Sequence, residues 1–184
     1  MIIGLSGYAQ SGKDTIANHL VKHHGFTRVA FADPIREALY AMNPTINDIP
    51  ELPGISLVWL VDKMGWEFVK VDSPETRRLL QRFGTEVGRN LWGENFWVDK
   101  AMAKINNYDN VVITDVRYPN EYQAIKDANG YMWRVEKPGV SAVNRHESET
   151  ALDELLFDGV LINKGTVEDL EATTSYLLMR GKND

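Results

Sequence analysis

The sequence predicts an α/β fold in which a central parallel sheet is flanked by helices on both faces. Short and nearly continuous apolar runs alternate along the chain with segments of helical periodicity. Such apolar strands are typical of a parallel sheet that helices cover on both sides. The first apolar run also leads through a glycine-rich turn directly into a helical pattern, which is how a β-α unit begins. In a sheet of this kind, ligands gather at the carboxyl ends of the strands.

The apolar runs predict five strands, most of which are separated by helices. Gly25 ends the first helix, which starts near Lys13, and Pro34 begins the second. The predicted strands cover residues 1–5, 28–32, 110–114, 131–135 and 159–162. Further helices are expected at residues 79–91, 96–105 and about 167–179.

Two stretches interrupt this alternation. Residues 43–74 are predicted to be an insertion with one short helix around Val58–Phe68. Residues 136–150 are polar and are predicted to form a loop. Neither stretch resembles a linker between domains, and a length of 184 residues fits one domain over residues 1–184.

The composition excludes several classes of protein. No apolar run approaches the roughly 20 residues that span a bilayer, so no membrane partner is expected. The net charge of −6 argues against broad nucleic-acid binding, because proteins that bind the phosphate backbone have basic surfaces. The absence of cysteine excludes disulfides and thiolate metal sites, and it fits a cytoplasmic protein.

Residues Gly7–Thr15 have the spacing and the context of a phosphate-binding P-loop. Gly7 and Gly12 allow the backbone, with Ser11 between them, to turn its N–H groups toward an anion. The helix that follows contributes the positive end of its dipole, and Lys13 reaches the β- and γ-phosphates. A glycine-rich turn without a ligand would leave Lys13 without a role, so the pattern favours a nucleotide site.

A metal ion is expected beside the phosphates. The position after the P-loop lysine normally has a hydroxyl group for Mg²⁺, but Asp14 occupies it here and Thr15 follows. Either Asp14 holds the ion, directly or through water, or it caps the helix and leaves the ion to Thr15. Asp115 ends the strand at 110–114, where P-loop proteins place an acidic residue that positions Mg²⁺. Its alternative role is a turn or cap.

Other charged residues follow strands or crowd one helix. Asp33 ends the second strand, where it could contact a substrate, with Arg36 nearby, or cap the helix that Pro34 begins. Arg117 lies just beyond the strand at 110–114, and phosphate contact is favoured over a surface ion pair.

A third predicted helix has several arginines close together. Arg78 and Arg82 are four residues apart on one helical face, where like charges repel unless an anion lies between them. Arg77 and Gln81 lie beside them. The cluster suggests a second anionic ligand, and solvated surface arginines are the alternative.

Taken together, these motifs resemble the bacteriophage-type deoxynucleoside monophosphate kinases, which are related to the adenylate-kinase-like P-loop kinases. The resemblance extends over nearly the whole chain and suggests a phage origin. Its residues are Ser11–Thr15, Arg77–Gln81, Gly84–Glu86, Phe96–Val98, Asp115–Arg117, His146–Glu149 and Leu161–Gly165. The Gly-Lys-Asp-Thr variant is itself familiar in that group.

The resemblance implies a P-loop NTPase fold with an acceptor-binding insertion (43–74) and a lid (136–150). It implies transfer of the γ-phosphoryl group of ATP, with Mg²⁺, to a deoxynucleoside 5′-monophosphate. Lys13, Asp33, Arg117 and Arg145 are the implied catalytic residues, with Arg145 in the lid. The implied ATP ligands are Gly7, Ser11, Gly12, Lys13, Asp14, Thr15 and Asn163. The implied acceptor ligands are Asp33, Arg36, Arg77, Arg78, Gln81 and Arg117.

Other functions remain open from the sequence. A dephospho-coenzyme A kinase or a phosphomevalonate kinase would use the same scaffold, and the former would need Asp33 as a base for a sugar hydroxyl. A nucleotide-dependent switch or binding module is the alternative from another class. Small-molecule nucleotides are the expected partners, and a homodimer is one option for the oligomeric state.

Overall fold

The computed structural model describes residues 1–50, 52–140 and 151–181, and their packing forms two units. The first, here called the sheet unit, consists of residues 1–31 and 101–184. The second, here called the helical unit, consists of residues 32–100. The single domain expected from the chain length stays a prediction.

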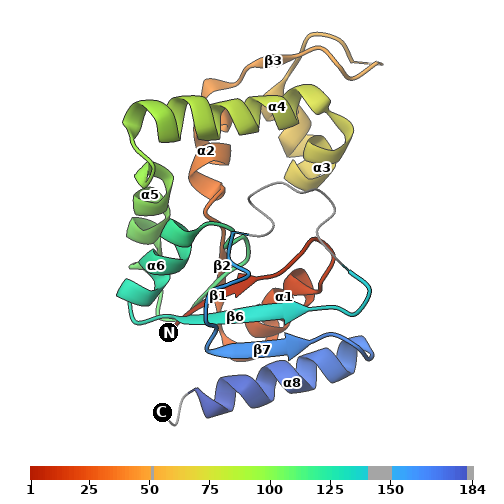
Figure 1. Ribbon diagram of the computed structural model, residues 1–184. Coiled ribbons are helices and arrows are strands. Elements are labelled where there is room, and N and C mark those ends of the chain that lie inside the picture. Colours follow the sequence, from red (N-terminus) through yellow and green to blue (C-terminus); the bar gives the residue numbers. More distant parts are fainter. Residues whose placement is uncertain (51, 141–150, 182–184) are drawn as a thin grey trace. The chain divides into compact units, whose positions relative to one another are not determined.

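A five-stranded parallel sheet forms the centre of the sheet unit (Figure 1). The strand order is β2-β5-β1-β6-β7, and every neighbouring pair is parallel. All five predicted strands are therefore confirmed, and their bounds differ from the predicted ones by a few residues. The strands are β1 (Ile2–Ser6), β2 (Thr27–Val29), β5 (Val111–Ile113), β6 (Tyr131–Glu136) and β7 (Gly159–Ile162).

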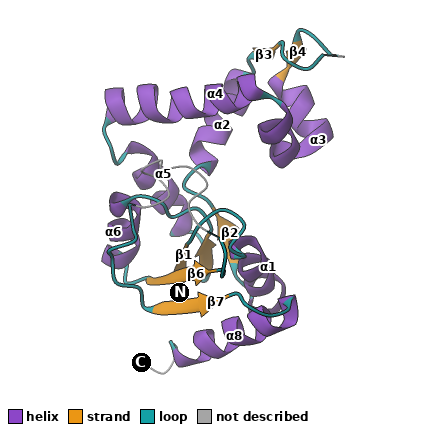
Figure 2. Cartoon of the chain, turned by 45° about the vertical axis from the view of Figure 1, so that its right-hand side comes forward, coloured by secondary structure: helices purple, strands orange, loops and turns teal. Residues whose placement is uncertain are grey.

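Helices cover both faces of this sheet (Figure 2). Ile3 and Leu5 of β1 point to one face, where they pack with buried residues of α1 (Lys13–His24) and α8 (Val167–Arg180). Gly4 points to the other face, toward α6 (Pro119–Asp127), and a side chain there would collide with buried Ile125 and Met132. The layered α/β fold predicted from the apolar strands is confirmed.

The helices of the sheet unit begin and end where local sequence signals place them. α1 ends at Gly25, whose φ of 70° is the left-handed conformation that glycine adopts readily. α8 begins with a capping box, in which the Thr166 hydroxyl accepts from the Asp169 N–H and the Asp169 carboxylate accepts from the Thr166 N–H. The sequence did not predict α6, which is short and has few buried apolar side chains.

The helical unit contains one small hairpin among its helices. Strands β3 and β4 pair in antiparallel fashion, and their two-residue lengths are too short to produce an alternating pattern in the sequence. The predicted short helix around Val58–Phe68 is part of a longer α3, which kinks at Gly65, where φ is 78°. The elements are α2 (Asp33–Met42), β3 (Thr45–Ile46), β4 (Ile55–Ser56), α3 (Leu57–Asp72), α4 (Pro74–Arg82), η1 (Phe83–Trp92) and the start of α5 (Phe96–Ile105).

The helix predicted for residues 79–91 changes from an α-helix to a π-helix along its length. α4 continues into η1, a π-helix, whose Gly84 carbonyl accepts a hydrogen bond of 2.9 Å from the indole N–H of Trp97. The indole also occupies the space that a side chain at Gly88 would need. Periodicity predicted the helical segment, whereas the wider turn accompanies this tertiary contact with Trp97. No helix of the described residues is long and apolar enough to cross a membrane.

Candidate phosphate-binding site

The loop between β1 and α1 has the backbone geometry of an anion site. Gly7 and Gly12 have φ values of 145° and 113°, which residues with a side chain rarely adopt. A Cβ atom at Gly7 would overlap the backbone carbonyl of Val135, and one at Gly12 would overlap the side chain of Asn163. Both glycines are therefore required by conformation and by space.

The amino end of α1 faces this loop without a side-chain cap. Gly12 is the N-cap residue and has no side chain with which to satisfy the N–H groups of the first turn. Such N–H groups have no partners within the helix, and the helix dipole adds partial positive charge at the same end. The arrangement suits a phosphate group.

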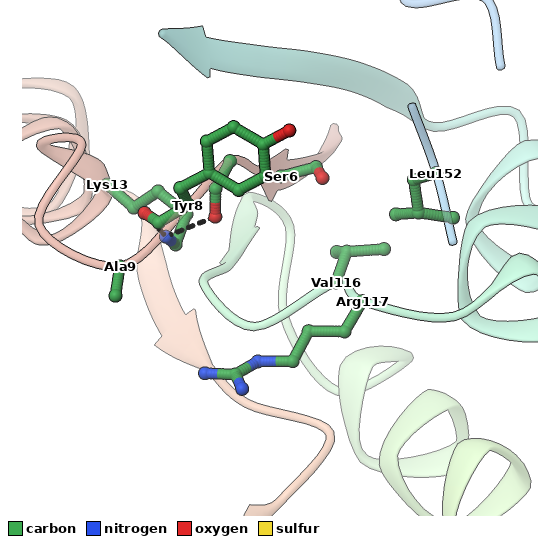
Figure 3. Close-up of a pocket in the computed structure, with 8 residues that line it drawn as sticks. Ser6, Tyr8, Ala9, Lys13, Val116, Arg117 and Leu152 are labelled. Carbon is green, nitrogen blue, oxygen red and sulfur yellow. Dashed lines mark hydrogen bonds between the residues drawn. The ribbon is translucent and has the colours of Figure 1, made fainter. Parts of the chain in front are cut away.

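Lys13 lies folded over the loop (Figure 3). Its ammonium donates hydrogen bonds of 2.7 Å and 2.8 Å to the backbone carbonyls of Gly7 and Tyr8. Both acceptors are neutral, so the lysine's positive charge is not neutralised by these two contacts. A phosphate could therefore attract this cation without displacing a carboxylate from these positions.

A pocket opens beside the loop, and all of its lining residues belong to the sheet unit. Figure 3 shows Arg117 extending from the segment after β5 toward the side of the pocket where Ala9 and Lys13 lie. Its guanidinium has no hydrogen-bond or ion-pair partner among the described residues, although its backbone N–H donates to Glu121. The lining consists of Ser6, Gly7, Tyr8, Ala9, Lys13, Val116, Arg117 and Leu152. The structure thus brings Lys13 and Arg117 to one pocket.

The three candidate metal ligands have different surroundings. The Asp14 carboxylate is 74% exposed and lies 2.7 Å from the guanidinium of Arg28. Asp115 follows β5, the neighbour of β1, and its carboxylate accepts a hydrogen bond of 2.8 Å from the N–H of Phe31. Thr15 lies half-buried in the first turn of α1. Within residues 1–50, 52–140 and 151–181, no three His, Cys, Asp or Glu side chains form a ready metal centre.

Asn163 lies against the loop. Its side-chain amide donates a hydrogen bond of 2.9 Å to the backbone carbonyl of Ser11. Ser11 is only 1% exposed, and its hydroxyl has no hydrogen-bond partner in the described part of the chain. Asn163 therefore supports the P-loop backbone directly, and its expected nearness to adenine stays a prediction.

The candidate acceptor ligands Asp33 and Arg36 belong to the helical unit. The Arg36 guanidinium lies 3.6 Å from both the Asp33 and the Glu67 carboxylates. α2 begins at Asp33 itself, with Ala32 as the N-cap residue and no side-chain cap hydrogen bond. Asp33 is therefore the first residue of the helix and not its N-cap residue, and the substrate contact of both residues stays a prediction.

The arginines of α4 have local partners that the sequence argument did not include. Arg82 forms hydrogen bonds of 3.0 to 3.1 Å with Glu86, one turn later. These bonds lower the pKa of the Glu86 carboxyl. The repulsion expected between Arg78 and Arg82 is thus offset by Glu86 and no longer indicates an anion. Arg77 donates to the backbone carbonyl of Lys70, whereas Arg78 and Gln81 are exposed.

The remaining catalytic candidate is Arg145. Arg145 and His146 lie outside the described residues, as does most of the predicted lid at 136–150. The expected role of Arg145 in the lid stays a prediction.

The structure adds Asp153 to the site and gives contacts there to Arg134, which flanks the predicted loop, and to Tyr8 of the P-loop. Arg134 on β6 is 8% exposed and forms an ion pair with Asp153. The Tyr8 hydroxyl donates a hydrogen bond of 2.9 Å to the same carboxylate. This hydrogen bond, with burial, raises the pKa of Tyr8. A charged residue within the otherwise apolar strand 131–135 was the available sequence signal.

Comparisons with known proteins show the family of this chain. The model of the deoxynucleotide monophosphate kinase family matches residues 63–174. A protein of Acanthamoeba polyphaga mimivirus, provisionally named as such a kinase, is 30% identical over 92% of this chain and 91% of its own. The deoxynucleotide monophosphate kinase of Enterobacteria phage T4 is 24% identical over 92% of this chain and 95% of its own.

A solved structure shows the same fold. The shikimate kinase of Aquifex aeolicus matches 99% of this chain and 98% of its own, with a TM-score of 0.51 and 14% identity. At this identity the likeness concerns the fold alone, and it agrees with a P-loop NTPase architecture.

Proposed function

Because this chain belongs to the deoxynucleotide monophosphate kinase family, we propose that it transfers the γ-phosphoryl group of ATP to a deoxynucleoside 5′-monophosphate. The products are ADP and the deoxynucleoside diphosphate. Small nucleotides are the substrates, and the cytoplasm, where such nucleotides are made, is the proposed location.

The observation that most supports this proposal is the P-loop itself. Its two required glycines, the uncapped start of α1 and the Lys13 ammonium converge on one place. We assign the β- and γ-phosphates of ATP to this place, with Lys13 exchanging its carbonyl partners for phosphate oxygens. Asn163 contributes by holding the Ser11 carbonyl.

The residues near the loop also fit Mg²⁺. In proteins this ion takes one or two oxygen ligands from side chains and the rest from substrate phosphates and water, so a three-residue cluster is not needed. The Thr15 hydroxyl and the Asp115 carboxylate are the assigned ligands, directly or through water. Asp14 is the weaker candidate, because Arg28 already pairs with it. When bound, Mg²⁺ neutralises negative charge on the phosphate oxygens.

Binding of the acceptor phosphate is assigned mainly to arginine side chains. Arg117 lines the P-loop pocket together with Lys13, and this position supports its assignment to the acceptor phosphate. Arg78, with Arg77 and Gln81, is assigned to the acceptor phosphate, and Asp33 and Arg36 to the rest of the acceptor. Arg145 is assigned the role of stabilising negative charge in the transition state.

The chemistry needs little from the protein beyond alignment and charge. The attacking atom is an oxygen of the acceptor phosphate, which is already a nucleophile at neutral pH, so no strong base is required. Lys13 and the arginines would hold donor and acceptor in line and stabilise charge on the transferred group. Asp33 then orients the acceptor and need not remove a proton.

The test is ADP formation from Mg²⁺–ATP with each of the four common deoxynucleoside monophosphates, their ribose counterparts, dephospho-coenzyme A and phosphomevalonate. Strong stimulation by one or more deoxynucleotides is expected. Stimulation by dephospho-coenzyme A or phosphomevalonate alone would contradict the proposed acceptor while keeping the phosphotransferase. A folded protein that binds ATP but responds to no acceptor would contradict the kinase itself.

A further inference from the structure

Arg134 is a buried arginine near the P-loop, and its guanidinium contacts several polar and aromatic side chains. Arg134 is directly beside Ser6 in the register of β6 and β1, at the carboxyl end of the sheet. Its guanidinium donates to the Ser6 hydroxyl at 3.3 Å and to the Asp153 carboxylate. It also lies 5.1 Å from the ring centre of Tyr8 and 5.6 Å from that of Phe157. A buried cation needs such partners, and Asp153 supplies the compensating charge.

Asp153 connects this arginine to the P-loop. One of its carboxylate oxygens accepts from Arg134, and the other accepts a hydrogen bond of 2.9 Å from the hydroxyl of Tyr8. This contact raises the pKa of Tyr8, which favours the protonated hydroxyl that donates the hydrogen bond. The Tyr8 ring is thus fixed at its hydroxyl by Asp153 and over its face by Arg134.

The backbone carbonyl of Tyr8 stabilises the conformation of the loop. This carbonyl accepts hydrogen bonds from the Lys13 ammonium at 2.8 Å and from the Ser11 N–H at 3.2 Å. A shift of Tyr8 would therefore move the acceptors that hold Lys13 and the turn that precedes Gly12. Tyr8 therefore contacts both the ion pair of Arg134 with Asp153 and the groups that are expected to bind phosphate.

We propose that Arg134 and Asp153 are positioning residues that act through Tyr8 to hold the P-loop in the conformation that receives the phosphates of ATP. The inference rests on the proposed nucleotide site and goes beyond the assigned ligands. A loop held in its binding conformation loses less conformational entropy when the nucleotide binds. Without the contact, ATP binds more weakly, while the chemistry of the bound complex changes little.

The test uses two substitutions that remove the contact from opposite sides. Tyr8→Phe deletes the hydroxyl alone, and Asp153→Asn deletes the charge while keeping the size. Each is expected to raise the Kd and the KM for ATP about five- to tenfold, with kcat at saturating ATP within about twofold. The double variant is expected to bind ATP no more weakly than Asp153→Asn alone, because Asp153→Asn already disrupts the contact that Tyr8→Phe deletes.

Tyr131→Phe is the matched control. Tyr131 begins β6, at the opposite end of this strand from Arg134, and donates its hydroxyl to the Gly181 carbonyl at 2.8 Å, so the same atom is removed from a tyrosine at the other end of the sheet. Its Kd for ATP is expected to equal that of the wild type. Equal Kd values for Tyr8→Phe and the wild type would overturn the inference. So would effects that multiply in the double variant, or an equal loss in Tyr131→Phe.

Binding and turnover separate this inference from the proposed function. The Kd for ATP is measured by calorimetry without any acceptor, after thermal unfolding has shown that each variant is folded. Weaker ATP binding by Tyr8→Phe supports the inference even if no deoxynucleotide is phosphorylated, in which case the acceptor assignment alone fails. A wild-type protein that does not bind ATP overturns both. If Asp153→Asn does not fold, Tyr8→Phe decides the matter with its control.

Discussion

The P-loop of the sheet unit and the arginine helix of the helical unit were both expected to bind phosphate, but their cations have different partners. Lys13 donates to two neutral carbonyls, within a loop whose glycines admit no other residue without strain. Arg82 is paired with Glu86, and Arg36 lies between two carboxylates. A phosphate at Lys13 would replace neutral carbonyls at these two positions, whereas one at Arg82 must compete with an existing carboxylate.

A run of positive side chains is therefore weaker support for an anion site than the backbone around a single lysine. Surface arginines are often neutralised by a glutamate one turn away, at little gain in stability. A loop with two positive-φ glycines before a helix start has no such alternative explanation. Arg78 is the exception in α4, because no partner for its guanidinium is found in the described ranges.

The largest effect is expected for Lys13→Ala. Loss of the ammonium removes charge stabilisation from the transferred phosphoryl group, and kcat/KM should fall by about a hundred- to a thousandfold. Lys22→Ala is the control, since Lys22 is exposed in the last turn of the same helix. Acceptor-stimulated ADP release is the measurement. Full activity in a folded Lys13→Ala protein would remove the P-loop from the mechanism.

The second prediction compares neighbouring arginines of α4. Arg78→Ala should raise the KM for the acceptor about tenfold, because a charge-assisted contact to its phosphate is lost. Arg82→Ala should change that KM by less than about twofold, because Arg82 already has a carboxylate partner in Glu86. Initial rates at varied acceptor concentration measure both. If Arg82→Ala has the greater effect, the contrast drawn between the two residues is wrong.

The third prediction separates the two residues that follow Lys13. Thr15→Val removes a hydroxyl at similar size and should raise the free Mg²⁺ concentration needed for half-maximal rate about fivefold. Asp14→Asn should change it less, because the Asp14 carboxylate is exposed and paired with Arg28. Titration of the initial rate with Mg²⁺ at fixed ATP decides between them. A larger shift for Asp14→Asn would make Asp14 the metal ligand.

The smallest expected effect concerns stability and pH. Three histidines of α1 lie together, with His19 Nε2 2.8 Å from the Ser175 hydroxyl and 3.3 Å from His24 Nε2, and with the His23 ring 5.0 Å away. Burial lowers the pKa of His19, against a raising effect of nearby Glu171. The folded state therefore binds the proton less readily than the unfolded state, in which the pKa is about 6.5.

Stability contributed by neutral His19 is present above that pKa and is lost as the pH falls below about 6.5. Thermal unfolding of the wild type should show a midpoint that falls between pH 7.5 and pH 5.5. The midpoint of His19→Gln should fall less than that of the wild type over this pH range. The midpoint of His23→Gln should fall about as much as that of the wild type, because the His23 side chain is exposed. A wild-type midpoint that rises toward pH 5.5 would contradict the assigned direction.

Much of the fold could be predicted from the sequence, for reasons that particular elements make clear. β1 and β5 are buried on both faces and therefore appear as nearly unbroken apolar runs, and β6 differs by the buried Arg134. The β3–β4 hairpin could not be predicted, because two-residue strands have no period. The change from α4 to η1 accompanies the packing of the Trp97 indole against Gly84 and Gly88, which periodicity does not show.

The sequence by itself determined the order along the chain of the five strands of the sheet and of most helices, the position of the P-loop and the identity of its lysine. These features depend on spacings within about a dozen residues and on the conformations that glycine alone adopts easily. Only the tertiary structure determined which distant side chains contact the P-loop. Asn163 reaches Ser11 across 152 residues of sequence, and Asp153 reaches Tyr8 across 145. Such contacts exist because a parallel sheet brings the carboxyl ends of distant strands to one edge, which no local pattern records.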